Sequence, residues 1–79
     1  VDLRRGGIVV DAVQARVQAA LERYRQGEPE DAARMLRQAI ALEPRQGTLW
    51  AALGELESER GEPDRALAAY RHAAHLEPS

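Results

Sequence analysis

The sequence predicts an all-α protein in which two tandem helix-turn-helix repeats stack into a short α-solenoid. Eighteen residues from Gly27 to Pro44 (GEPEDAARMLRQAIALEP) recur thirty-four residues later, from Gly61 to Pro78 (GEPDRALAAYRHAAHLEP), and nine of the positions are identical. The apolar residues recur at helical spacing, and no segment alternates with period two over a useful length. A fixed period of this size is typical of a solenoid, whose units bury their apolar faces by stacking on one another.

The N-terminal segment 1–10, VDLRRGGIVV, carries no helical stripe and has two glycines directly after two arginines. We expect it to form a linker or arm ahead of the first repeat. Its apolar triplet 8–10 leaves two interpretations open, packing under the first helix or docking on a neighbouring surface. The sole strand candidate, 7–10, is too short to assign. Because the chain begins with Val1, we expect a fragment or a processed product.

The first repeat is expected over residues 11–46 as two helices. Asp11 can cap the first helix, and Gly27 ends it, because helices commonly end at a glycine with positive φ. Pro29 opens the second helix, where its missing N–H costs little, and Pro44 ends that helix. The predicted buried stripes are Val13, Val17, Ala20, Leu21 and Tyr24 in the first helix and Ala32, Leu36, Ala39 and Ile40 in the second.

The second repeat, residues 47–79, follows the same plan. Thr48 is the expected cap of its first helix, Gly61 ends that helix, Pro63 opens the next one and Pro78 ends it. The predicted apolar stripes are Leu49, Trp50, Leu53 and Leu56 in the first helix and Ala66, Leu67, Tyr70, Ala73 and Ala74 in the second.

The composition argues against several functions. The net charge is −2 with both signs interspersed, so the chain lacks the basic face that nucleic-acid binding needs. No apolar run approaches the roughly 18–20 residues of a membrane span, so we expect no membrane insertion. Arginine supplies every basic side chain apart from histidine, and alanine is abundant, which favours a GC-rich bacterium as the source. The compartment is not determined, although the cytoplasm is favoured over the periplasm.

Several residues fall at the spacing of a known signature. They are Trp50, Leu53, Gly54, Ala66, Tyr70, Ala73 and Pro78 in the second repeat and Ala20, Ala32, Leu36, Ala39 and Pro44 in the first. On these residues the chain resembles the tetratricopeptide repeat family over 11–79. The resemblance implies a right-handed α-solenoid that acts as a non-catalytic protein-interaction module.

The sequence also departs from this signature. Arg16 and Ala19 stand at the first-repeat positions of the signature Trp and Leu, and Arg23 and Glu57 replace an aromatic residue in mid-helix. The small side chains at Gly54 and its counterpart are expected where paired helices approach closely. Trp50 and Tyr70 are expected to fill the space between consecutive helices.

The resemblance implies a concave groove lined by the first helix of each pair, which binds a peptide or helix of another protein. The implied groove positions are Gln14, Val17, Gln18, Leu21, Tyr24, Arg25, Thr48, Ala51, Ala52, Glu55, Ser58 and Glu59. A Lys/Asn/Arg clamp for a terminal carboxylate is not expected, because its positions hold Val17, Leu21 and Ala52. Glu55 and Glu59 favour an apolar ligand with a basic flank, and the alternative is a merely solvated helix face.

The last helix is expected to leave part of its apolar stripe open, at Leu67, Tyr70 and Ala74. An open apolar edge is expected to find a partner. Three coverings are possible: a capping helix in a longer chain, the arm 1–10, or a second copy in a homodimer. The alternative function is therefore homo-oligomerisation of a larger bacterial protein, and regulation of a fused enzyme is a third.

No catalytic, metal or cofactor chemistry is predicted. His72 and His75 are three residues apart on one helix but have no acidic or third ligand close by. The pair Gly6 and Gly7 lacks the length and the lysine of a phosphate-binding loop. Cysteine is absent, which removes both a thiolate nucleophile and a disulfide.

Overall fold

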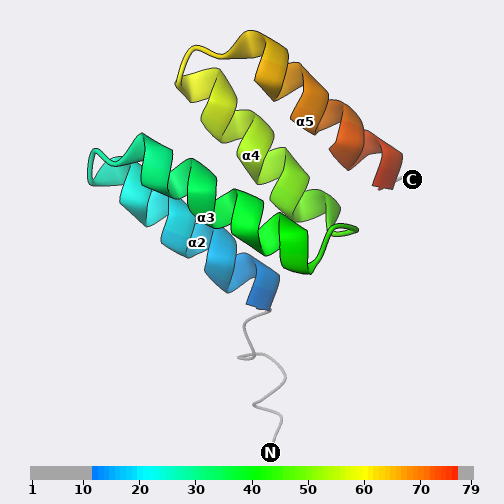
Figure 1. The fold of residues 1–79 in the computed structure, drawn as a ribbon, viewed down its shortest axis with the longest axis horizontal. Helices are drawn as coiled ribbons and strands as arrows, with labels where there is room; N and C mark the ends of the chain where they lie inside the picture. Colours follow the sequence, from blue (N-terminus) through cyan, green and yellow to red (C-terminus); the bar gives the residue numbers. More distant parts are fainter. Residues whose placement is uncertain (1–11, 77–79) are drawn as a thin grey trace, which may run out of the picture.

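The computed structural model describes residues 12–76 and confirms the all-α fold. Four helices follow one another: α2 (Ala12–Arg25), α3 (Pro29–Leu42), α4 (Gly47–Glu59) and α5 (Pro63–Leu76). Figure 1 shows them as two antiparallel hairpins side by side, with α5 at one edge of the molecule. Asp11, Pro78 and the arm 1–10 lie outside the described residues, so their predicted roles stay predictions.

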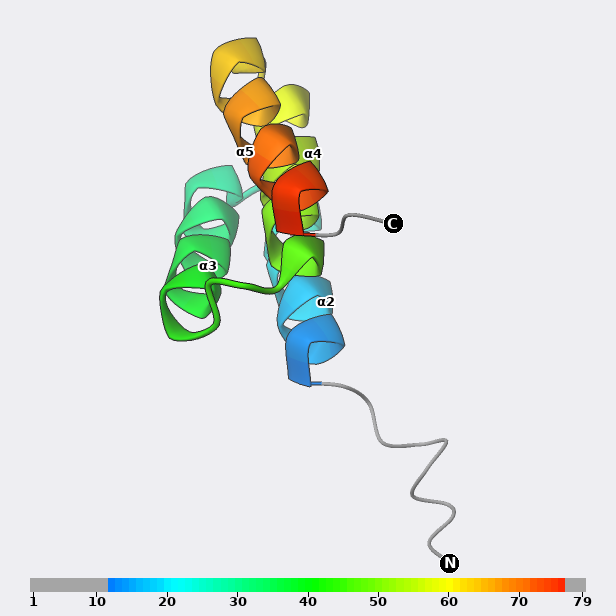
Figure 2. The same cartoon turned by 90° about the vertical axis from the view of Figure 1, so that its right-hand side faces the viewer.

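Helix α3 is set to one side of the others. Seen from the side, α3 lies apart from α2 and α4, and α5 runs alongside α4 and partly overlaps it (Figure 2). α4 contacts each of the other three helices, most extensively α5 and least α2, whereas α5 packs only against α4 among the described helices. The second hairpin is therefore joined to the first through α4, and one side of α5 has no neighbour among the described residues.

Both hairpin turns confirm the predicted glycine ends. Gly27 and Gly61 have φ of 83° and 79°, which is the left-handed region that glycine adopts at little cost. After α2, the Gly27 N–H donates to the Tyr24 carbonyl and the Glu28 N–H to the Arg23 carbonyl, both at 3.0 Å. This pair of bonds is the Schellman motif, which satisfies carbonyls that the helix end would leave free.

The helix starts agree with prediction in α3 and α5 but not in α4. Pro29 and Pro63 are the first residues of their helices. Thr48, however, is not a cap: α4 already begins at Gly47, and its N-cap residue, Gln46, makes no side-chain capping bond. A threonine inside the first turn has helical backbone angles, so it cannot occupy the extended N-cap position.

The core lies between the packed helices and is largely aliphatic. Its fully buried members include Ala32, Leu36 and Leu49, which are at most 1% exposed. The predicted stripes of α2, α3 and α4 supply most of it, with Leu21, Tyr24 and Trp50 half-buried at its rim. In α5, the predicted Ala66 and the unpredicted Ala69 are buried, and Leu67, Tyr70 and Ala74 are exposed, as expected for the open part of the stripe. Ala33 of α3 and Ala52 of α4 are also buried, although the predicted stripes of those helices did not include them.

Gly54 explains how closely α4 and α5 approach. A Cβ atom on Gly54 would lie 2.9 Å from Cδ1 and Cε1 of the Tyr70 ring. This is closer than carbon atoms pack without strain. The expected small residue therefore makes room for an aromatic side chain of the facing helix, and that side chain is itself 40% exposed on its other side.

Candidate functional site

α2 and α4 place polar and apolar side chains around a cavity of about 350 Å³. Leu21, Tyr24 and Arg25 come from the last turns of α2, and Glu55, Leu56 and Glu59 from the second half of α4. Leu21 and Tyr24 are half-buried against the core, and their remaining surface forms an apolar wall. Tyr24 also borders a second hollow, of about 470 Å³, beside Gly27, Pro29, Glu30 and Arg60.

The structure gathers some of the predicted groove residues in this cavity and separates others from it. Leu21, Tyr24, Arg25, Glu55 and Glu59 line the cavity together with Leu56, which the sequence reasoning assigned only to the core. Val17 and Ala52, expected in the groove floor, are 9% and 8% exposed and belong to the core. The remaining predicted positions lie outside the cavity: Gln14, Gln18, Thr48 and Ser58 are exposed and Ala51 is half-buried.

The carboxylates of the cavity are free to meet a ligand. Glu55 and Glu59 are exposed, and within residues 12–76 neither forms an ion pair or a side-chain hydrogen bond. Arg25, in contrast, donates to Glu22 at 3.2 Å on its own helix. The net character of this surface is therefore apolar with two unneutralised negative charges.

Glu57 is a buried charged residue whose ion pairs were not predicted from the sequence. It is 2% exposed, its Oε2 accepts a bond from Arg37 Nη2 of α3 at 3.1 Å, and its Oε1 accepts one from Arg60 Nη1 at 3.2 Å. A buried carboxylate with both oxygens paired is a structural tie between α3 and α4. The available signal was its phase, because Glu57 lies four residues after Leu53 and eight after Leu49 on the buried stripe.

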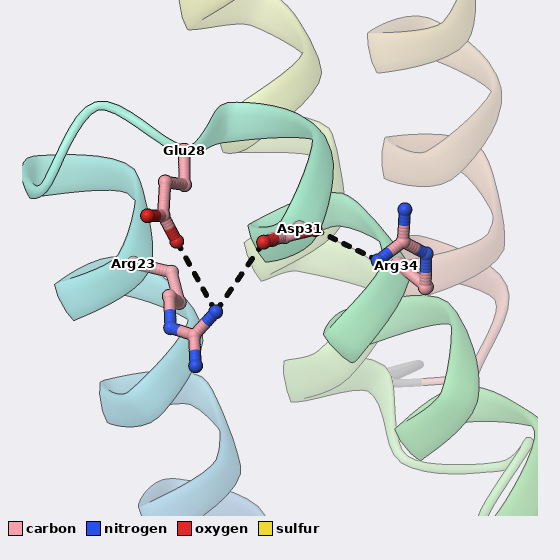
Figure 3. Close-up of polar contacts among 4 residues, drawn as sticks. All are labelled: Arg23, Glu28, Asp31 and Arg34. Carbon is pink, nitrogen blue, oxygen red and sulfur yellow. Dashed lines mark hydrogen bonds and ion pairs between the residues drawn. The ribbon is translucent and has the colours of Figure 1, made fainter.

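The first repeat has a different charge cluster at the same position. Arg23 Nη1 donates to Glu28 at 3.2 Å and to Asp31 at 3.3 Å, and Arg34 donates to the second oxygen of Asp31 at 2.7 Å (Figure 3). All four side chains are more than a third exposed. Ion pairs at this level of exposure stabilise weakly. This cluster therefore links α2 to α3 but contributes little to the stability of their packing.

Trp50 and His72 stack at the junction of α4 and α5. Their ring centroids are 4.1 Å apart, with 20° between the ring planes. The Trp50 indole N–H donates to the Pro44 carbonyl at 2.9 Å, which ties the α3–α4 loop to the same place. Trp50 is half-buried. As expected, it fills space between consecutive helices, although part of the ring stays exposed.

Residues 12–76 contain no cluster of three or more His, Cys, Asp or Glu side chains that could hold a metal ion. None of the four helices is long and apolar enough to cross a membrane.

Comparison with known families agrees with the repeat geometry. The family model described as "Tetratricopeptide repeat" matches residues 17–79. The chain therefore belongs to the tetratricopeptide repeat family, whose members typically act as non-catalytic repeats that mediate protein–protein interactions. A search of curated proteins finds no matching sequence.

Proposed function

We propose that this chain is a protein-interaction module that binds a peptide or helix of another protein. The binding surface is the cavity between α2 and α4, called the α2–α4 groove below. The observation that carries the proposal is the cavity of Leu21, Tyr24, Arg25, Glu55, Leu56 and Glu59. Its half-buried apolar wall offers surface that a ligand can remove from water. Its two unpaired carboxylates favour a ligand with apolar side chains and a neighbouring Arg or Lys.

A peptide selection tests this proposal. Random twelve-residue peptides displayed on phage are selected against the chain, and the enriched sequences are expected to combine apolar residues with a basic flank. Reversal of both charges, Glu55→Arg with Glu59→Arg, is expected to weaken binding of an enriched peptide by about tenfold or more. Asp64→Arg, an exposed acidic position on α5, is the control and is expected to leave binding unchanged. Unchanged affinity in the groove variant would contradict the proposal.

The second candidate function is homo-oligomerisation through the open edge of the repeats. Leu67 and Tyr70 are 51% and 40% exposed and lie three residues apart on α5, so they offer adjacent apolar surface to a second copy. Light-scattering mass on a sizing column at several protein concentrations separates the two candidates. A dimer that persists on dilution supports self-association, and a monomer at every concentration removes it.

A further inference from the structure

The exposed face of α5 has a counterpart in the first repeat, on α3, that is covered by another helix. Leu67, Tyr70 and Ala74 of α5 stand thirty-four residues after Ala33, Leu36 and Ile40 of α3. The three α3 residues are 1%, 1% and 8% exposed, whereas Leu67 and Tyr70 are 51% and 40% exposed and Ala74 is also exposed. α4 packs on α3, and no helix among the described residues packs on this side of α5.

The same comparison identifies a charge that lacks its partner. Arg37 of α3 donates to the buried Glu57 of α4 at 3.1 Å. Its counterpart on α5 is Arg71, which is exposed and forms no ion pair or hydrogen bond with a side chain of residues 12–76. A helix that seats on α5 as α4 seats on α3 would bring a carboxylate to Arg71, and Arg–carboxylate bonds are among the stronger and more directional polar contacts.

We propose that the outer face of α5 docks an amphipathic helix of a partner protein. This helix carries apolar residues at the spacing of Leu49, Leu53 and Leu56 and an acidic residue directly after the third of them, where α4 has Glu57. The apolar side chains cover Leu67, Tyr70 and Ala74, and the carboxylate pairs with Arg71. The surface is separate from the α2–α4 groove, so the inference does not rest on the groove proposal.

A second copy of this chain does not fit the same face head to tail. The helix that would be presented is α2, which has Ala15, Ala19 and Glu22 at the three leucine positions and Arg23 at the Glu57 position. Two alanines and a charge supply little apolar area. Arg23 would also meet Arg71 with like charge, which disfavours the pairing.

The test uses a probe that carries the inferred chemistry. The 79-residue chain is titrated against a fluorescein-labelled peptide of residues 47–59, held helical by a hydrocarbon staple between positions 55 and 59, and binding is followed by fluorescence anisotropy. Saturable binding in the micromolar range is expected. Arg71→Glu in the protein is expected to weaken binding by about tenfold. The peptide with Glu57→Arg is expected to restore binding to the Arg71→Glu protein.

Two controls locate the bound peptide. Leu67→Glu is expected to abolish binding, while Leu42→Glu, at an even more exposed leucine of α3 (70% exposed), leaves it unchanged. If the peptide instead displaced α4 from α3, Arg71→Glu would have no effect, and that result overturns the proposal. An absence of saturable binding up to about 1 mM, or a stable dimer of the chain that excludes the peptide, overturns it equally.

Discussion

Each oxygen of the Glu57 carboxylate accepts a hydrogen bond from a different arginine, Arg37 or Arg60. The Glu57 side chain is 2% exposed, Arg37 49% and Arg60 17%, so Arg37 keeps contact with water while the carboxylate and most of Arg60 do not. Loss of the negative charge removes the acceptor of the Arg37 guanidinium at the buried site and leaves Arg60 with its 3.7 Å ion pair to Glu30.

We expect Glu57→Gln to lower the free energy of unfolding by about 1–3 kcal/mol, since an amide is a weaker acceptor and turns an N–H₂ group toward arginine. Urea unfolding followed by circular dichroism measures this change. Arg23→Met is the matched control at the same repeat position, and its exposed ion pairs predict a loss below about 1 kcal/mol. Equal losses in both variants would show that burial does not set the strength of these contacts.

The effect of Gly54→Ala on stability is expected to depend on whether the Tyr70 ring is present. Alanine favours helix over glycine by about 1 kcal/mol, but here its Cβ would press on the Tyr70 ring at 2.9 Å. Gly54→Ala is therefore expected to destabilise the wild-type chain and to stabilise the Tyr70→Ala chain, where the ring is absent. Chemical denaturation of the four proteins in this double-mutant cycle measures the coupling. The same sign in both backgrounds would contradict the role given to the ring.

At the scale of the helices, the two Schellman turns depend on backbone angle alone. No heavy atom lies within 4 Å of a Cβ built on Gly27, so a side chain there meets a cost only from its positive φ. Gly27→Ala is expected to lower the free energy of unfolding by about 1–2 kcal/mol. Gly27→Asn is expected to cost less, because asparagine tolerates this region better. Thermal unfolding compares the two, and an identical loss would point to a lost contact.

Helix number and helix ends could be predicted from the sequence because their causes are local. Gly27 and Gly61 terminate helices and Pro29 and Pro63 begin them through their own backbone preferences. Thr48 could not be placed, since Gly47 is compatible both with a loop and with a first helical residue. The pairing of Glu57 with Arg37 joins residues twenty positions apart, and neither spacing nor propensity reports which arginine reaches a buried carboxylate.

The candidate site was predicted only in outline. The resemblance named twelve groove positions, and five of them line the cavity. Val17 and Ala52 lie on helices that face the groove, yet the curvature of two packed hairpins puts these side chains under the surface. Whether a side chain faces the groove or the core depends on a rotation of a fraction of a helical turn. That rotation is set by how the helices pack, which the apolar pattern does not determine.

At the scale of the whole molecule, we expect the stack to be uneven in stability. α5 packs closely only against α4, while α4 contacts three helices. In a repeat array, stability is roughly a sum of unit and interface contributions, so an end element with one interface opens most easily.

Native-state hydrogen exchange followed by NMR is therefore expected to show lower protection for the amides of α5 than for those of α3 and α4. Lower protection follows because opening α5 breaks a single interface, whereas opening α4 breaks three. Uniform protection over all four helices would mean that the domain opens only as a whole. Addition of a ligand that covers α5 is expected to raise the protection of that helix first.

The Trp50–His72 stack also provides an intrinsic fluorescence signal for the position of α5. Trp50 is the single tryptophan of the chain, and its ring lies 4.1 Å from the imidazole of α5 while its N–H is bonded to the loop before α4. If α5 separates from α4, the Trp50 indole loses its stacked His72 ring, and this loss does not require the first hairpin to unfold. Intrinsic fluorescence thus reports the docking of the last helix, free of any introduced label, during assembly, ligand capture or thermal fraying.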